Sequence, residues 1–335
     1  MLRIRFDTQD LGRVRLVREP DPLWEVVLSL PQFADARPRS AAHHAWQAAA
    51  WRATAGGLAR RARELLSVLV PPKGDFPDFL NPPEARDGLE SGLAAIRSLP
   101  RATLHADLAA AMRRRASVPG WTKALASADR EARSLLELAI REYFRAAIEP
   151  HWPVVRRHVM ADRAARTRHA AEFGVDGLLS GISPRIRWDW PVLEAEYPCE
   201  QSVDLRGRGL VLIPSFFCAG SPVSFIDPEL PPVLVYPAAA EGATMLPERD
   251  VSALANVLGR TRASILLALE RPCSTTELAE SIDMSLASAS HHVGLLRAAG
   301  LAHTARTGTS VRHQLTALGY ALLDAPCGRS PFELG

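Results

Sequence analysis

Residues 1–18 alternate between apolar and polar side chains. Leu2, Ile4 and Phe6 are separated by arginines, and the alternation resumes a few residues later. A period of two is typical of a strand with one buried face, so we expect two short strands here. From Pro22 the apolar positions take up helical spacing, and proline suits the first turn of a helix.

Residues 37–175 are rich in Ala, Leu and Arg and predict a mostly helical region. Proline and glycine predict breaks at several points: Gly56-Gly57, Pro71-Pro72, Asn81-Pro82-Pro83, Pro100 and Pro119-Gly120. A long helical stretch over residues 127–173 contains Pro150 and Pro153, which we expect to kink or divide it.

Residues 181–237 change character, because proline and glycine separate short apolar runs. These runs predict several short strands, which we expect to pair with the N-terminal strands in one sheet beside the helices. The segment 237–249 has the composition of a linker. We therefore predict an N-terminal dimerisation or effector-sensing domain over residues 1–240 and a second domain over 248–325. The expected fold class is mainly α, with a small β-sheet in the N-terminal domain.

The C-terminal part carries helix signals in a regular order. Helices are predicted over residues 251–258 and 262–270. A capping box follows, in which the side chains of Ser274 and Glu277 each accept a hydrogen bond from the other residue's backbone N–H. Ser285 caps a further helix, which glycine ends at residue 300. A short terminal helix is expected over 317–323.

The helix predicted over residues 286–299 has two distinct faces. Ala289, Val293 and Leu296 share one stripe and should face the core. The opposite side is small or hydrogen-bonding and has no carboxylate: Ala287, Ser288, His291 and Gly294. Such a face can enter the major groove of DNA without repelling phosphate, and its hydroxyl and imidazole groups can bond base edges or phosphate oxygens.

A strand, a tight turn and a second strand follow this helix. The tripeptide Thr307-Gly308-Thr309 is the expected turn, and Arg306 and Arg312 flank it, where they can reach the DNA backbone or the minor groove. The pattern predicts a winged helix-turn-helix that binds duplex DNA. Ten residues are predicted to contact DNA: Thr275, Ser285, Leu286, Ala287, Ser288, Ser290, His291, His292, Arg306 and Arg312.

The segment MSLASASHHVGLLRAAGL, residues 284–301, resembles the recognition-helix region of the ArsR family of transcriptional regulators. The matching positions are Ser285, Ser290, His291, His292, Val293, Leu296, Arg297, Gly300 and Leu301. The resemblance implies a homodimeric repressor that reads an inverted repeat, with two recognition helices in successive major grooves. Segments 69–83 and 209–238 resemble the N-terminal domain of long, two-domain ArsR-type regulators from actinobacteria. This second resemblance does not indicate a ligand for the domain.

The chain departs from the metal-sensing branch of that family. The stretch 275–283 has no cysteine, although metal sensors carry a Cys-x-Cys motif there, and the terminal helix has no histidine. The four cysteines of the chain are widely spread and show no CxxC spacing, which favours reduced thiols. We expect no metal and no cofactor.

Composition fits an ordinary soluble protein. The 335 residues are 47% hydrophobic and carry a formal net charge of +3, which by itself is too weak to argue for nucleic acid. No apolar run approaches the length of a membrane span, and the N-terminus lacks the apolar core of a signal peptide. We therefore expect a cytoplasmic protein with no membrane partner.

All seven tryptophans lie in the N-terminal part of the chain, where most should be core residues. Some can instead line a pocket for a small-molecule effector. The candidates are His43, Trp46, Trp51, Trp152 and Trp188. No P-loop, GxGxxG, GxSxG or HExxH motif is present, so we expect no enzyme. The alternatives are an enzymatic N-terminal domain tethered to a DNA reader and a winged helix that docks proteins.

Overall fold

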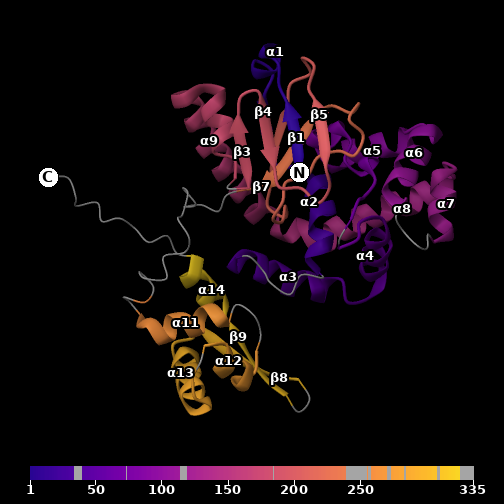
Figure 1. The fold of residues 1–335 in the computed structure, drawn as a ribbon. Coiled ribbons are helices and arrows are strands. Elements are labelled where there is room, and N and C mark those ends of the chain that lie inside the picture. Colours follow the sequence, from indigo (N-terminus) through magenta and orange to yellow (C-terminus); the bar gives the residue numbers. More distant parts are fainter. Residues whose placement is uncertain are drawn as a thin grey trace. The chain divides into compact units, whose positions relative to one another are not determined.

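The computed structural model describes residues 1–33, 40–72, 74–113, 119–183, 185–238, 255, 258–269, 273–282, 284–307 and 310–324. The chain divides into two compact units (Figure 1). Met1–Ala34 and Ala49–Glu241 form the first, called here the N-terminal unit, and Asp35–Ala48 and Gly242–Gly335 form the second, the C-terminal unit. The domain boundary predicted between residues 240 and 248 lies outside the described residues.

The N-terminal unit contains a four-stranded sheet in the order β3 (Ile186–Asp189), β4 (Val192–Ala195), β1 (Leu2–Arg5) and β5 (Gln201–Asp204). The first strand of the chain lies inside this sheet, antiparallel to β4 and parallel to β5. Its burial alternates as its sequence predicts, with apolar residues buried and arginines exposed.

A second sheet holds three parallel strands, β2 (Arg15–Leu16), β6 (Val211–Ser215) and β7 (Val233–Pro237). The expectation of a single sheet was therefore wrong. The short helix α1 (Thr8–Leu11) separates β1 from β2 and redirects the chain. Asp7 caps α1 and forms a capping box with Asp10, a signal that the alternating pattern obscured.

Helices make up most of the N-terminal unit. They are α2 (Pro22–Ser29), α4 (Gly57–Leu69), α5 (Leu89–Ser98), α6 (Arg101–Met112), α7 (Gly120–Ala126), α8 (Arg130–Tyr143) and α9 (Trp152–Ser180). The helix α3 (Ala41–Ala53) is divided between the units, because its residues up to Ala48 belong to the C-terminal unit. The predicted breaks lie between helices or at their first residues, and Pro150 lies in the irregular turns that divide α8 from α9. In Figure 1 α9 runs beside β3, and Leu178 and Leu179 at its end join the core of the four-stranded sheet.

Buried carboxylates hold the loops of this unit. Glu25 of α2 is 1% exposed and accepts hydrogen bonds from the Ser215 hydroxyl at 2.9 Å and from the N–H groups of Phe216 and Phe217 at 3.0 and 3.1 Å. Burial raises the pKa of Glu25 to about 7. Asp21, which caps α2, is also buried, and burial raises its pKa to about 6.

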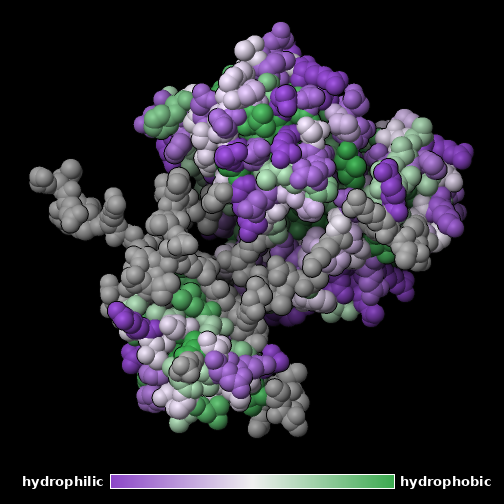
Figure 2. All heavy atoms as spheres, viewed as in Figure 1, coloured by the Kyte–Doolittle hydropathy of each residue, from purple (hydrophilic) through white to green (hydrophobic). Residues whose placement is uncertain are grey.

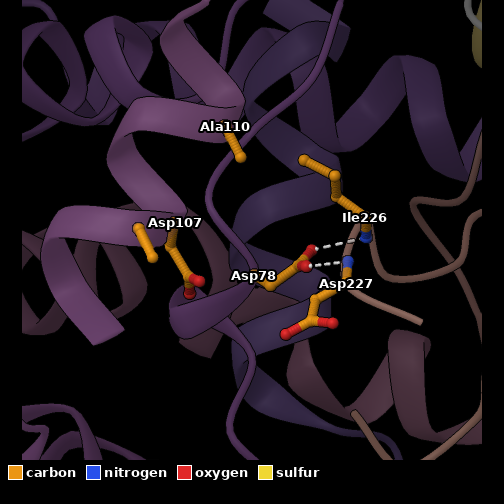
Figure 3. A pocket seen from close by; sticks show the side chains of 6 residues that line it. Asp78, Asp107, Ala110, Ile226 and Asp227 are labelled. Atoms are coloured by element: carbon orange, nitrogen blue, oxygen red, sulfur yellow. Dashed lines mark hydrogen bonds between the residues drawn. The ribbon is translucent and has the colours of Figure 1, made fainter. Parts of the chain in front are cut away.

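Asp78 holds a second loop, at residues 226–227, in the same way. Its carboxylate accepts hydrogen bonds from the N–H groups of Ile226 at 3.0 Å and Asp227 at 2.8 Å (Figure 3). A hollow of about 180 Å³ opens beside it, and Asp107 and Ala110 of α6 also line it. Burial raises the pKa of Asp78 to about 7, so this carboxyl group gains a proton more easily than an exposed aspartate.

The C-terminal unit follows the predicted order of elements. It contains α11 (Arg260–Ala268), α12 (Thr275–Ser281), α13 (Leu286–Ala298), the hairpin of β8 (Ala302–Thr307) and β9 (Ser310–Leu315), and α14 (Ala317–Asp324). The helix expected over 251–258 lies mostly outside the described residues. A mainly helical fold with small sheets and a winged C-terminal domain is thus confirmed. Within the described ranges, every helix is too short or too polar to cross a bilayer.

Candidate nucleic-acid interface

Two serine caps set the start of the central helices of the C-terminal unit. The Ser274 N–H donates to the Glu277 carboxylate at 2.7 Å, and the Glu277 N–H donates to the Ser274 hydroxyl at 3.2 Å, so the predicted capping box is confirmed. Ser285 caps α13 by accepting the Ser288 N–H at 3.2 Å. These local bonds fix where each helix begins and therefore which residues of α13 face outward.

The core side of α13 is as predicted. Ala289, Val293 and Leu296 are 0%, 2% and 2% exposed and pack in the apolar core of the C-terminal unit. The four residues expected on the opposite side are all exposed: Ala287, Ser288, His291 and Gly294. On the visible face of this unit, hydrophobic and hydrophilic residues are interspersed (Figure 2).

The outward face of α13 is open and uncharged. A methyl group placed on Gly294 would meet no atom within 4 Å, so nothing in the described part of the chain covers this position. Leu286, at the start of the helix, is 54% exposed, and Ser285 and Ser290 are exposed as well. A convex helix surface of this kind suits the major groove, where small side chains let the backbone approach the bases.

The two adjacent histidines of α13 differ in exposure. His291 is exposed, whereas His292 is half-buried, and their rings lie edge to face with centroids 5.4 Å apart. The Nδ1 atom of His292 is buried and has no hydrogen-bond partner among the described residues. The His291 ring is therefore open to solvent, while the His292 ring is partly covered by the domain.

The wing is an antiparallel hairpin. Its pairs run from Ala302 with Leu315 to Thr307 with Ser310, while the turn residues Gly308 and Thr309 lie outside the described residues. The side chain of Arg306 is also outside the described part. Arg312 is exposed, and its guanidinium lies 4.0 Å from the Glu277 carboxylate.

That ion pair is weak by its geometry and exposure. Both side chains are about half exposed, so water and salt screen the attraction between them. A phosphate group can therefore compete with Glu277 for the Arg312 guanidinium.

Comparison with known proteins assigns this part of the chain. Residues 258–305 match the family of helix-turn-helix domains. The C-terminal unit contains an ArsR-like helix-turn-helix domain with a β-hairpin wing, and this domain suggests DNA binding. The match covers α11, α12, α13 and most of β8, and the N-terminal unit lies outside it. No curated protein and no solved structure matches the chain.

The helix-turn-helix domain also contains a polar contact that the sequence analysis missed. Thr275, predicted to contact DNA, is half-buried, and its hydroxyl lies 2.8 Å from Nε2 of His313. The other ring nitrogen of His313 lies 2.9 Å from the Thr304 hydroxyl. The period of two along β9 was the available signal, because it places His313 on the same inward face as the buried Leu315.

The five effector-site candidates lie on different elements: His43, Trp46 and Trp51 on α3, Trp152 at the start of α9, and Trp188 on β3. His43 and Trp46 belong to the C-terminal unit, whereas the other three belong to the N-terminal unit. Trp46 is 1% exposed. Three hollows on the described surface of the N-terminal unit are lined by other residues.

The tryptophans of the N-terminal unit pack against neighbours of their own. The Trp51 ring lies edge to face with Phe33 at 5.1 Å, and the Arg63 guanidinium lies 4.4 Å from its centre. The Trp188 ring packs against Phe6, the residue after β1, with ring centroids 4.9 Å apart, and its Nε1–H donates to Asp176 at 2.7 Å. Each ring thus has an aromatic neighbour and a polar or charged neighbour, and Trp51 is nevertheless 45% exposed.

Proposed function

We propose that the protein is a transcriptional regulator of ArsR type that binds duplex DNA as a homodimer. In this proposal it represses transcription by occupying an inverted-repeat operator, with α13 of each copy in the major groove. The observation that carries the proposal is the exposed, carboxylate-free face of α13 within a helix-turn-helix domain. The ten predicted contact residues are the ones we assign to DNA.

The proposal gives the N-terminal unit a role in dimerisation, in sensing a small molecule, or in both, and no catalytic role. A ligand would release DNA only by binding more tightly to a state in which the two reading helices are misplaced. A broad metabolite screen tests this part, with melting temperature and DNA affinity as readouts. No response to any compound would count against sensing.

Footprinting on the DNA upstream of the protein's own gene tests DNA reading. We expect two protected half-sites whose centres are about 34 Å apart, one turn of the duplex. Protection that is not symmetric would contradict the dimer. Failure to bind any duplex in a salt-dependent manner would instead favour a winged helix that docks proteins.

Substitutions separate the contacts that read sequence from those that bind the backbone. Ser288→Ala and His291→Ala should relax the choice at one or two base pairs at a cost of about 1–3 kcal/mol each, with little change on random DNA. Arg312→Ala should weaken binding to every duplex and lower the salt slope by about one. Arg145→Ala, in the N-terminal unit, is the matched control for loss of an exposed arginine. Equal losses on specific and random DNA for all three contact variants would contradict the assigned roles.

A further inference from the structure

Three polar side chains form a continuous row across the helix-turn-helix domain. Thr304 on β8, His313 on β9 and Thr275 at the start of α12 follow one another at 2.9 and 2.8 Å. His313, in the middle, is 7% exposed, while both threonines are half-buried. The row therefore has its most buried member at the centre and a partly exposed hydroxyl group at each end.

Backbone bonds hold the imidazole and Thr275 in register. The His313 N–H donates to the Cys273 carbonyl at 2.8 Å, and the Cys273 N–H donates to the His313 carbonyl at 3.1 Å. The residues just before α12 thereby extend the hairpin by one bridge. Because Thr275 follows Cys273 by two residues, its position depends on the wing as well as on its own helix.

The row has two possible directions of donation. Burial, together with the nearby Arg297, lowers the pKa of His313, so the ring is neutral near pH 7 and has one N–H donor and one acceptor nitrogen. In one direction, the Thr304 hydroxyl donates to Nδ1 and Nε2–H donates to the Thr275 oxygen. In the other, the Thr275 hydroxyl donates its only proton to Nε2.

Only the first direction leaves Thr275 able to donate to a ligand. A DNA phosphate oxygen accepts hydrogen bonds and cannot donate them, so it needs the proton of the Thr275 hydroxyl. When Nε2–H donates to the Thr275 oxygen, that proton is free to point outward. Hydrogen bonds arranged head to tail in this way also strengthen one another.

We propose that His313 is a positioning residue for DNA binding, which, with its proton on Nε2, holds the Thr275 hydroxyl so that it donates to a phosphate oxygen of the duplex. The inference rests on the proposed function, because it requires Thr275 to contact DNA. His313 itself does not touch the duplex. Its ring links the wing to the reading unit through the Thr275 hydroxyl, beside the two backbone bonds to Cys273.

Binding of the full chain to a fluorescein-labelled, mixed-sequence duplex tests the proposal, because a phosphate contact does not depend on sequence. Thr275→Val and His313→Leu should each weaken binding about three- to tenfold, as expected for one hydrogen bond. The double variant should be no weaker than the weaker single variant. The salt slope should stay unchanged, since a neutral hydroxyl releases no counterion.

Rescue distinguishes positioning from simple support of the fold. His313→Gln should keep most of the affinity, because its amide N–H can replace Nε2–H as the donor to Thr275. His303→Gln is the matched control, since His303 lies on the same hairpin and is paired with Gln314. It should bind like the unaltered chain. Nitrogen NMR of the His313 ring should show the proton on Nε2.

Several results would overturn the inference. They are unchanged binding by Thr275→Val, additive losses in the double variant, a His313→Gln variant as weak as His313→Leu, or a proton found on Nδ1. Thr275→Val keeps the shape of a half-buried side chain, so it remains informative if His313→Leu does not fold. No binding by the unaltered chain overturns the proposed function and this inference with it, whereas binding that Thr275→Val leaves intact overturns the inference alone.

Discussion

The two units use their buried polar groups in different ways. The N-terminal unit buries carboxylates in its interior, where Glu25 and Asp78 accept hydrogen bonds from the backbone of loops. The C-terminal unit has an apolar core and places its polar row, with His313 at its centre, between the wing and α12. The first arrangement holds loops in place, and the second connects the elements proposed to meet DNA.

Distance along the chain explains the difference. Glu25 bonds groups about 190 residues away, and Asp78 bonds groups 148 and 149 residues away. In the C-terminal unit Thr275 and His313 are 38 residues apart, and Thr304 and His313 only 9. Segments that meet from far apart need bonds that fix their register, whereas neighbouring helices and a hairpin are aligned by their own caps and turns.

Removal of the Glu25 carboxylate should have the largest effect. Glu25→Ala leaves the Ser215 hydroxyl and two buried N–H groups without an acceptor, and we expect a loss of about 4 kcal/mol in the free energy of unfolding. Chemical denaturation monitored by tryptophan fluorescence measures it, because the N-terminal unit holds most of the tryptophans. Glu64→Ala, which removes an exposed carboxylate on α4, should change the midpoint little. A similar loss in the free energy of unfolding for both variants would mean that burial of the carboxylate does not explain the effect of Glu25→Ala.

A cavity in the C-terminal unit should have the next largest effect. Leu296→Ala removes buried methyl groups from the core of α13 and should cost about 3 kcal/mol, with loss of DNA binding. The neighbouring Leu295 is 38% exposed, so Leu295→Ala should cost less than about 1 kcal/mol. Calorimetry of both variants measures the difference. Equal losses would show that α13 is turned differently about its axis.

The two units should respond oppositely to acid. Burial raises the pKa of Asp21, Glu25 and Asp78 to about 6, 7 and 7, so the folded N-terminal unit binds protons that the unfolded chain does not. Its stability should therefore rise as pH falls from about 7 to about 5. The pKa of His313 is lowered instead, so the stability of the C-terminal unit should fall below about pH 6.5.

Calorimetry across this pH range should show the two melting transitions moving in opposite directions. Glu25→Gln should flatten the rise of the first transition, and His313→Gln the fall of the second, because neither amide titrates. Parallel shifts of both transitions would contradict the contrast between the units.

The smallest effect is expected for a substitution on α13 that changes the stability of the fold and the affinity for DNA in opposite directions. Gly294→Ala should raise the free energy of unfolding by about 0.5–1 kcal/mol, because glycine is unfavourable inside a helix and the new methyl group meets no atom. DNA affinity should fall, since the methyl group prevents close approach of α13 to the duplex. Thermal melting and fluorescence anisotropy measure the two changes. A stabler protein with unchanged affinity would mean that this face does not lie against DNA.

The C-terminal fold was predictable because its signals are local. Ser274 with Glu277, Ser285, and the stripe of Ala289, Val293 and Leu296 each act within one or two turns of helix, and each was confirmed. The split into two sheets in the N-terminal unit was not foreseen. It depends on α1 and on the pairing of β2 with β6, about 200 residues later, which no short pattern encodes.

The candidate site was predictable only in part. The exposure of α13 followed from helical period, but the partner of Thr275 did not, because His313 reaches it across the fold. The roles of the ten predicted DNA contacts remain predictions. The tryptophan candidates were chosen by composition, and composition does not show which aromatic rings line the same pocket.

The place of β1 inside its sheet bears on how the chain is made. A ribosome adds about 5–20 residues per second, so β1 emerges about 10–40 s before the β5 strand that pairs with it, about 200 residues later. Until then Leu2 and Ile4 have no sheet to enter and are open to chaperones. From α11 to α14, in contrast, most contacts join elements that are close in the sequence, so this part can fold soon after it leaves the ribosome.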